Sequence, residues 1–331
     1  MVRSPDAVAL AEAAATLRAG GLVGLPTETV YGLAADATNP TAVAKIFAAK
    51  GRPSDHPLIV HVADAGSVDH FAASVPGFAQ RLMAAFWPGP LTLILPRRPE
   101  VAAAAAGGQD SVGLRCPAHP VAQALLRACA DAGVPGLAAP SANLFGRVSP
   151  TTAAHVLGEF GSDLLVLDGG PCRVGIESTI VDCSRGVPVL LRPGQLTLAR
   201  LSAACGQPVL LPDAVPRAAP RASGTLEAHY APRAKVRLMD AKALQTALDL
   251  LQGVDKTPPV IALWSRSVLQ VRSPLVLARR MPDDADATAQ QLFGQLRDFD
   301  AQGVKLIWVE TPPDAPAWAG VLDRLSRAAA S

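Results

Sequence analysis

The stretch Lys50-Gly-Arg-Pro-Ser-Asp-His-Pro-Leu-Ile-Val-His61 combines two cations, a hydroxyl, a carboxylate and two imidazoles. Pro53 and Pro57 restrict the residues before them to extended geometry, so we expect a stiff loop. Cations held in a stiff loop can stabilise an anion without reorganising as charge develops. We therefore interpret this loop as an anion site. The alternative is a solvated surface loop in which Lys50 complements the dipole of a helix end.

Lysine is rare in this part of the chain, which bears on the role of Lys50. Residues 1–234 contain 16 arginines but two lysines, Lys45 and Lys50. A lysine ammonium is a compact charge whose pKa shifts readily on burial, whereas a guanidinium stays charged. The composition favours a chemical reason for a lysine at position 50, and chance is the alternative.

The flanking sequence predicts the elements that position this loop. Residues 42–49 have a helical pattern, with Asn39 as N-cap and Pro40 at the first helical position. Gly51 is expected to end that helix. Residues 58–62 are apolar and partly β-branched, which is typical of a strand. The loop is thus expected to join a helix end to a strand.

Two further strands are predicted to carry polar side chains. Residues 22–25 predict a short buried strand, and residues 26–32 place two threonines, a glutamate and a tyrosine after it, where open sheets commonly bind ligands. In the strand predicted for 111–115, alternation places Ser111 and Arg115 on one face. Such a face suits a ligand. Good strand formers at 26–32 and a surface face at 111–115 are the alternatives.

The same pattern recurs later in the chain. A small-residue strand is predicted at 136–139, followed by Ser141 and Asn143, which would point the same way in an extended chain. Their neutral donors suit phosphate oxygens or a nucleotide base. The spacing favours Ser149 as a helix N-cap over a ligand contact. Two more polar residues at predicted strand ends are Ser178 and Arg192. If these loops converge, they form one pocket for an anionic ligand.

The length, composition and net charge of the chain limit the class of protein to which it can belong. With 331 residues, half of them apolar, the chain can bury a substantial core in two domains. Its net charge of +2 lacks the bulk basicity of a dedicated nucleic-acid binder. Five cysteines without a CxxC pair argue against a disulfide framework and a zinc site. We find no apolar run long enough for a membrane span and no signal-peptide pattern, so we expect a cytoplasmic protein.

The chain divides by composition. A large domain is expected at 1–205, followed at 206–232 by an extended linker with five prolines. Residues 233–331 alternate strand and helix patterns, which predicts a small α/β domain. Residues 102–110 are small and polar, and we expect a mobile loop there. Neither GxGxxG nor GxxxxGK[ST] occurs, so any ATP site must use another device.

Seven segments in order resemble the signature segments of the YrdC-like family of threonylcarbamoyl-AMP synthases, in its longer form with an appended C-terminal domain. The resemblance as a whole covers roughly residues 8–232. The segments are Pro26-Thr-Glu-Thr-Val-Tyr-Gly-Leu33, Lys50-Gly-Arg52, His56-Pro-Leu-Ile-Val-His61, Trp87-Pro-Gly-Pro-Leu-Thr92, Ala139-Pro-Ser-Ala-Asn143, Gly175-Ile-Glu-Ser-Thr179 and Leu191-Arg-Pro-Gly194. His229-Tyr-Ala-Pro232 further suggests the longer form. His56 stands where the family commonly has Asn.

The resemblance implies an α/β fold: a large domain with a twisted mixed sheet and flanking helices, and a smaller Rossmann-like C-terminal domain. It implies a nucleotidyltransferase that joins L-threonine, bicarbonate or CO2, and ATP with Mg2+ into L-threonylcarbamoyladenylate, releasing pyrophosphate. The product would pass to a transferase complex that modifies tRNA beside the anticodon.

The resemblance also assigns roles to residues, and it assigns no protein ligand to a metal. Those implied to hold threonine, with Arg115 on its carboxylate, are Thr29, His61, Arg115, Ala139 and Ser178. Those implied to contact ATP are Arg52, His56, Ser111, Ser141, Ser149, Arg192 and Tyr230. Those implied to form the catalytic cluster are Lys50, Arg52, Ser141 and Asn143.

Other classes of function stay open at this point. The predicted anion pocket could instead bind double-stranded RNA, in a protein of RNA or ribosome maturation. The chain lacks an Arg/Lys-rich face, which disfavours this alternative. Weak RNA contact is compatible with either function. A carbamoyl-transfer module of the hydrogenase-maturation kind would bring zinc-finger and acylphosphatase-like segments, and none is visible. We further expect the linker to form a lid over the nucleotide pocket, because residues 223–230 lack proline and carry Glu227, His229 and Tyr230.

Overall fold

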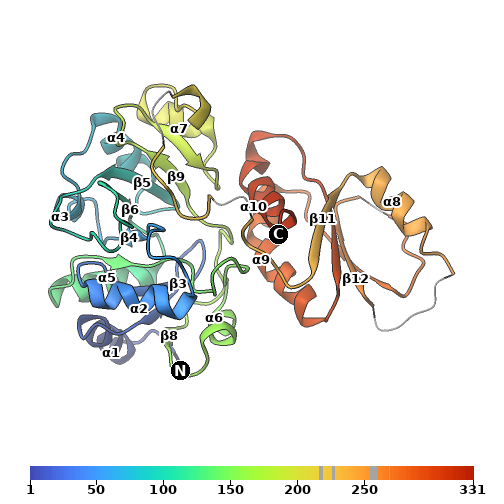
Figure 1. Cartoon of the computed structure of the whole chain (residues 1–331), viewed down its shortest axis with the longest axis horizontal. Coiled ribbons are helices and arrows are strands. Elements are labelled where there is room, and N and C mark those ends of the chain that lie inside the picture. The colour runs from blue at the N-terminus through green and yellow to red at the C-terminus, as the bar shows by residue number, and fades with distance from the viewer. Residues whose placement is uncertain (216–218, 226–227, 254–258, 268) are drawn as a thin grey trace. The chain divides into compact units, whose positions relative to one another are not determined.

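The computed structural model describes residues 1–215, 219–225, 228–253, 259–267 and 269–331 (Figure 1). The chain forms two compact units, each described here by itself. The first comprises residues 1–145 and 149–225, and the second comprises 146–148 and 226–331. The chain thus passes from one unit to the other inside the segment 206–232 that composition marks as a linker.

Among its described residues, the first unit holds a ten-stranded mixed sheet with the order β1-β8-β2-β3-β7-β4-β6-β5-β9-β10. The strands are β1 (Val2–Arg3), β2 (Val23–Leu25), β3 (Gly32–Asp36), β4 (Ile59–His61), β5 (Leu91–Pro96), β6 (Ser111–Arg115), β7 (Leu137–Ala138), β8 (Leu165–Leu167), β9 (Thr179–Asp182) and β10 (Val189–Arg192). The helices are α1 (Ala7–Arg18), α2 (Pro40–Lys50), α3 (Val68–Phe71), α4 (Gly77–Phe86), α5 (Pro120–Asp131), α6 (Ala153–Phe160) and α7 (Leu198–Cys205).

Apolar side chains of the helices pack against this sheet in separate clusters. One cluster contains Leu17 of α1 and Leu125 of α5 together with Leu25 of the sheet. Another contains Ile46 of α2 and Leu82 of α4. The flanking helices around the sheet are visible in Figure 1. This arrangement confirms the predicted mixed sheet with flanking helices.

Helix α2 begins and ends where the sequence predicts. Asn39 Oδ1 accepts hydrogen bonds from the backbone N–H groups of Thr41 and Ala42, and Pro40 occupies the first turn, where its missing N–H costs nothing. Gly51 has φ +62°, a left-handed conformation that glycine adopts without a Cβ penalty. These caps fix the position of Lys50 at the end of the helix.

The central strands bring distant segments together. Strands β4 and β6 are parallel, with His61 opposite Arg115, and β7 pairs antiparallel with β4, with Leu137 opposite His61. Strand β3 pairs with β7 on its other side. Residues that precede or follow these strands, at 26–31, 51–58 and 139–143, are therefore gathered beside one another.

The second unit contains a four-stranded parallel sheet with the order β11-β14-β12-β13 among the described residues. Its strands are β11 (Lys235–Met239), β12 (Ile261–Ser265), β13 (Val276–Arg280) and β14 (Leu306–Glu310), and its helices are α8 (Ala241–Asp249), α9 (Ala285–Ala301) and α10 (Ala319–Ala329). This confirms the predicted small α/β domain. The sequence analysis had missed β13 and α10.

Two local predictions are wrong. In the segment 102–110, which composition marks as mobile, Ala102, Ala105 and Ala106 are buried, and Ala105 O accepts a hydrogen bond of 2.7 Å from Leu58 N. Small side chains had suggested mobility, but they also pack closely. Ser149 does not cap a helix, because the N-cap of α6 is Thr152.

Across the described residues, we find no helix that combines the length and apolar character needed to cross a membrane.

Candidate functional site

Lys50 lies at the end of α2 with 2% of its surface exposed. Its Nζ donates to Ser141 O at 2.5 Å and to Asn143 O, and its own carbonyl accepts from Phe145 N at 2.9 Å. Burial, with a smaller effect of the nearby charge of Arg52, lowers the pKa of Lys50 to about 7. Lys50 therefore fastens the loop 141–145 to the end of α2 and titrates near neutral pH.

Arg52 and His56 surround the ring of Phe145. The Arg52 guanidinium lies 5.6 Å from the ring centroid, and its Nη2 donates to Pro57 O at 3.1 Å. The His56 ring meets Phe145 edge-on with centroids 5.4 Å apart. Partial burial lowers the pKa of His56, and the charge of Arg52 adds to that effect. A cation and a neutral imidazole thus share one aromatic neighbour.

The sequence interpretation places Ser141 and Asn143 in an extended chain. The structure differs at this point. Asn143 N donates to Ser141 O at 3.0 Å, so the backbone turns back between them. The Asn143 side chain is buried, and its Nδ2 donates to Leu144 O at 2.7 Å. Gly32 approaches this region closely, since a Cβ on it would lie 3.1 Å from the Ala139 Cβ. A turn, not strand alternation, sets where the two side chains lie.

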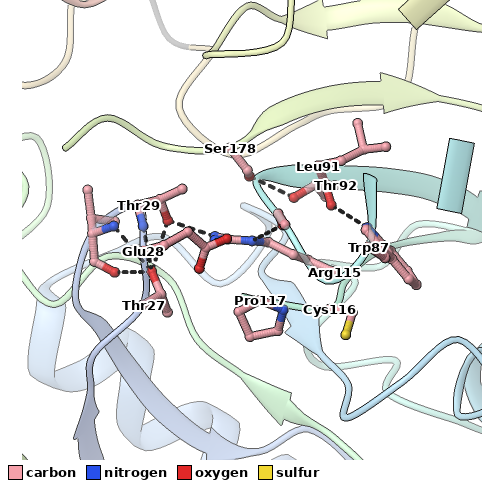
Figure 2. A network of polar contacts seen from close by, with 12 residues as sticks. Thr27, Glu28, Thr29, Trp87, Leu91, Thr92, Arg115, Cys116, Pro117 and Ser178 are labelled. Carbon is pink, nitrogen blue, oxygen red and sulfur yellow. Dashed lines mark hydrogen bonds and ion pairs between the residues drawn. The ribbon is translucent and has the colours of Figure 1, made fainter. Parts of the chain in front are cut away.

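Arg115 is the centre of a buried polar cluster (Figure 2). Its Nη2 lies 2.7 Å from Glu28 Oε1, and its Nη1 donates to Thr29 Oγ1 at 2.8 Å. Its Nε donates to Gly89 O at 3.3 Å. The hydroxyls of Thr27 and Thr29 are 2.9 Å apart. Segments near residues 28, 89 and 115 therefore meet at one guanidinium.

His61 lies beside Arg115 on the neighbouring strand and is 3% exposed. Burial lowers its pKa to about 3, and the charge of Arg115 contributes in the same direction. The imidazole is thus neutral at physiological pH. Within the described residues its Nδ1 has no hydrogen-bond partner. Ala139 is tied to the same strand, since its N–H donates to Ile59 O at 3.0 Å.

Ser178 contacts Thr92 and Arg192. The hydroxyls of Ser178 and Thr92 are 2.7 Å apart. Arg192 donates to Ser178 O through Nε at 3.1 Å and Nη2 at 2.8 Å, and its Nη1 donates to Ser223 O at 2.8 Å. A buried arginine therefore joins a strand end to the segment near residue 223.

Ser149 has a different partner from the one its spacing suggests. Its Oγ donates to Glu177 Oε1, and both residues are buried. Glu177 precedes Ser178 in the chain, so this hydrogen bond connects the loop after residue 143 to the Ser178 region. A buried hydroxyl on a carboxylate is consistent with a site position and excludes a capping role.

Ser111 borders a small cavity of about 20 Å³, and the segment 221–223 forms part of its wall. That volume is of the order of one water molecule. Arg221 Nη1 lies 2.7 Å from Asp55 Oδ2, and its Nη2 donates to Gly107 O at 3.0 Å. In this structure, residues 221–223 thus cover the sheet face that carries Ser111.

Tyr230 belongs to the second unit. It is buried, its ring centroid lies 5.4 Å from that of Phe293, and the Arg324 guanidinium lies 5.5 Å from it. Its backbone has φ +61°, which is uncommon for a residue other than glycine. The assignment of Tyr230 to ATP stays a prediction.

Within the first unit, the structure joins some of the other residues that the sequence singled out in two sets, one around Lys50 and one around Arg115. Direct contacts join Lys50 to Ser141 and Asn143, and join Arg115 to Thr29. The individual roles of these residues stay predictions. Among described residues, no group of three or more His, Cys, Asp or Glu could hold a metal ion.

Sequence reasoning assigned no individual role to four residues that contact the segments it singled out: Glu28, Thr92, Glu177 and Arg221. Three of them stand inside or at the end of quoted motifs, so the signal was present. Their partners lie far away in the chain, and the motifs do not name them. Arg221 lies in the proline-rich segment and carried no signal.

Comparison with known proteins identifies the family. The family model described as "Telomere recombination" matches residues 15–194, and the one described as "Threonylcarbamoyl-AMP synthase, C-terminal domain" matches 196–330. Threonylcarbamoyl-AMP synthase of Bacillus subtilis is 38% identical over 97% of this chain and 92% of its own length. The synthase of Pyrococcus abyssi is 37% identical over 96% and 92%.

A solved structure is similar in fold as well. The crystal structure of P. abyssi Sua5 complexed with L-threonine matches with a TM-score of 0.85 and 36% identity, covering 97% of this chain and 94% of that one. Both domains are therefore shared. From the buried cluster, the two family models and these relatives, the chain belongs to the threonylcarbamoyl-AMP synthase family, in its two-domain form.

Proposed function

We propose that this chain, as a member of its family, joins L-threonine, bicarbonate or CO2, and ATP into L-threonylcarbamoyladenylate and releases pyrophosphate, as a nucleotidyltransferase. The observation that carries the proposal is the buried Arg115 cluster, in a chain whose length matches the synthases almost throughout. A buried guanidinium with the hydroxyls of Thr29 and Thr27 beside it suits the carboxylate of a small hydroxy amino acid.

Threonine is assigned to the cluster around Arg115. Arg115 holds the carboxylate, and Thr29 and Ser178 offer hydroxyls on either side. His61, neutral at physiological pH, can donate or accept one hydrogen bond without adding charge. Ala139 leaves room for the substrate. A buried hydrogen bond to the threonine hydroxyl would reject an analogue that lacks it far better than a pocket sensing one methyl group.

ATP is assigned to the set around Lys50. Attack of a carbamate oxygen on the α-phosphorus brings two anions together, so alignment and fixed positive charge matter more than a strong base. Arg52 supplies a charge that does not titrate. Lys50 is close to its titration midpoint and holds the turn at Ser141 and Asn143 through two carbonyls.

The remaining residues assigned to ATP are His56, Ser111, Ser149, Arg192 and Tyr230. Mg2+ is proposed to arrive with ATP, because it usually keeps several waters and binds through substrate phosphates. It would neutralise phosphate charge. No protein nucleophile is required for the adenylation step, in which the two clusters hold their substrates in line.

The segment 221–223 is proposed as part of a lid over the nucleotide pocket. A cavity of about 20 Å³ beneath it is far too small for ATP, so the segment must move for the nucleotide to enter. Closing again would shield the adenylate, a mixed anhydride, from water. The contact of Arg221 with Asp55 and that of Arg192 with Ser223 would hold the closed form.

The adenylate is proposed to pass to a transferase complex that modifies tRNA, with at most weak direct contact between this chain and RNA. Such a partner places the reaction in the cytoplasm. The double-stranded RNA alternative has no comparable support, since the chain matches synthases along nearly its whole length.

The test uses the purified full-length protein with Mg2+, ATP, bicarbonate and isotopically labelled L-threonine. We expect pyrophosphate, and a product whose mass equals that of the labelled adenylate. Omission of threonine or bicarbonate should abolish both signals. Pyrophosphate release that ignores threonine would contradict the proposal.

A further inference from the structure

Glu28 is a buried carboxylate whose hydrogen bonding is incomplete. Its side chain is 4% exposed, and Oε1 lies 2.7 Å from Arg115 Nη2 (Figure 2). Oε2 accepts no hydrogen bond from any residue that the structure describes. A buried carboxylate oxygen without a donor is costly, and such cases in native proteins call for a functional explanation. The environment of Glu28 therefore lacks one donor, and a cationic donor would suit it best.

Nearby groups do not supply that donor. Arg115 also serves Thr29 and Gly89. Among the described residues, the other titratable side chains that respond to the charge of Glu28 are His119 and the thiols of Cys172 and Cys116. Burial and then Glu28 raise the pKa of Cys172 to about 12, and burial raises the pKa of Cys116, whose Sγ donates to Ala63 O at 3.4 Å. The His119 Nε2 lies 3.2 Å from Gly169 O, and its Nδ1 accepts from Val121 N, so this ring is already occupied.

The ligand proposed for Arg115 carries the missing donor. In an α-amino acid, the carboxylate carbon and the nitrogen are bonded to the same carbon atom. If Arg115 holds the carboxylate, the ammonium group lies beside the guanidinium, where the carboxylate of Glu28 also lies. This step rests on the proposed function, because it takes Arg115 as the carboxylate partner.

We propose that Glu28 binds the α-ammonium group of threonine through Oε2 and takes its proton when the amine reacts. The ammonium gives one proton to Glu28, which frees the nitrogen lone pair. That lone pair forms the N–C bond to the carbon of CO2, while one C=O bonding pair moves onto oxygen to give the carbamate. The second nitrogen proton leaves to water. Glu28 later returns its proton to solvent, so the cycle is balanced.

The binding half is tested by calorimetric titration of the full-length protein with L-threonine and with (R)-3-hydroxybutanoate, the same molecule without its amino group. In Glu28→Gln, we expect threonine affinity to fall by at least about 30-fold, the effect of removing one partner of a buried charge pair. Affinity for 3-hydroxybutanoate should not fall. Equal weakening of both ligands would mean that Glu28 only orients Arg115, and it would overturn the proposal.

The proton-transfer half is tested at saturating threonine, where binding no longer limits the rate. We expect adenylate formation by Glu28→Gln to be slower by about 100-fold or more, the usual contribution of a positioned base. A normal rate under these conditions would refute proton transfer to Glu28.

A matched control is Glu310→Gln in the second unit. Glu310 is also a buried glutamate paired with an arginine, Arg266, at 2.9 Å. Threonine affinity and turnover should be unchanged in this variant. Should Glu28→Gln fail to fold, Glu28→Asp keeps the charge and shifts it by one methylene. It should weaken threonine more than 3-hydroxybutanoate, and equal effects would again overturn the proposal.

A third ligand, (R)-1-aminopropan-2-ol, lacks the carboxylate and tests the role of Arg115 separately. If wild-type protein bound it as well as threonine, Arg115 would lose its assignment. The comparison between threonine and 3-hydroxybutanoate would still decide the role of Glu28. The two failures are thus distinguishable.

Discussion

Each unit of the molecule contains a buried glutamate paired with an arginine, and the two pairs differ in how completely they are hydrogen bonded. In the second unit, Glu310 Oε2 accepts from Ser265 Oγ at 2.6 Å and Ser267 N at 2.7 Å, and Oε1 accepts from Arg266 and Ser267 Oγ. In the first unit, Glu28 has its ion pair to Arg115 and an Oε2 without a donor among the described residues.

This difference in hydrogen bonding distinguishes a structural ion pair from one that we propose binds a ligand. Burial alone would raise the pKa of Glu310, yet the hydrogen bonds from Ser265 and Ser267 and the charge of Arg266 hold it below its usual range. Arg266 also lies 5.5 Å from the Trp318 ring, and although its Nε has no acceptor among the described residues, both oxygens of Glu310 have donors within the fold. The network joins the ends of β12 and β14. The Glu28 cluster leaves one carboxylate oxygen for a donor that the described residues do not provide.

Lys50 tests whether complete hydrogen bonding is enough to identify a structural residue. Its donors reach two backbone carbonyls, as in a structural network, yet we assign it to the chemistry. Lys50→Ala should reduce turnover by about 1000-fold, because both a positive charge and the placement of the turn at Ser141 are lost. Pyrophosphate release that depends on threonine and bicarbonate is the measurement. A near-normal rate would show that hydrogen-bond completeness identifies structural residues even here.

Arg115 tests whether the cluster that contains Glu28 binds threonine. Removing it leaves Glu28 and the substrate carboxylate without their shared cation. Because loss of one partner of a buried charge pair costs about 3 to 5 kcal/mol, Arg115→Ala should weaken threonine binding by roughly 100-fold or more. ATP affinity should persist. Calorimetric titration with each ligand tests this, and unchanged threonine affinity would remove Arg115 from the site.

Part of this site could be predicted from the sequence, because local rules decide it. Asn39, Pro40 and Gly51 define α2 by capping and backbone preference, and these signals involve neighbours in the chain. The pairing of Glu28 with Arg115 depends on the order of strands in the sheet, which no local pattern states. The motif around Glu28 therefore showed a carboxylate at a strand end but not its partner.

The errors have equally local causes. Ser149 and Thr152 are both hydroxyl residues ahead of α6, so spacing alone does not decide which one caps the helix. Strand β13 has an exposed end, at Arg279 and Arg280, and shows little apolar alternation. Helix α10 was missed despite a usable signal, since its buried residues Val321, Leu325 and Ala328 follow the helical period.

His61 extends the comparison to pH. Its folded pKa of about 3 lies below the ordinary value of 6.5, so between these values the unfolded chain binds more protons than the folded protein. Stability should therefore rise with pH across this window and fall on acidification. From neutral pH to pH 5, His61 should account for a loss of about 2 kcal/mol in the free energy of unfolding.

Denaturant titration of wild type and His61→Gln at a series of pH values measures this contribution. We expect a flatter dependence in the variant below pH 6.5. If the two curves are parallel, His61 does not titrate as proposed and the imidazole is not held neutral by burial.

The pair Arg221–Asp55 should give the smallest effect on stability, because both side chains are about half exposed, at 52% and 58%, unlike Glu28 and Arg115. Exposed ion pairs contribute little, so Arg221→Ala should change the free energy of unfolding by no more than about 1 kcal/mol.

The effect of Arg221→Ala should instead be local. Arg221 also donates to Gly107 O, and these contacts hold residues 221–223 over the face that carries Ser111. Without them, the segment 219–225 should open more often and be cut faster by protease, while ATP and threonine together should restore protection. Limited proteolysis followed by mass measurement of the fragments tests this. The matched control is Arg280→Ala, which removes an exposed ion pair to Asp283 in the second unit and whose arginine is 52% exposed, as Arg221 is. Equal cleavage rates in wild type and Arg221→Ala would show that Arg221 does not hold the segment closed.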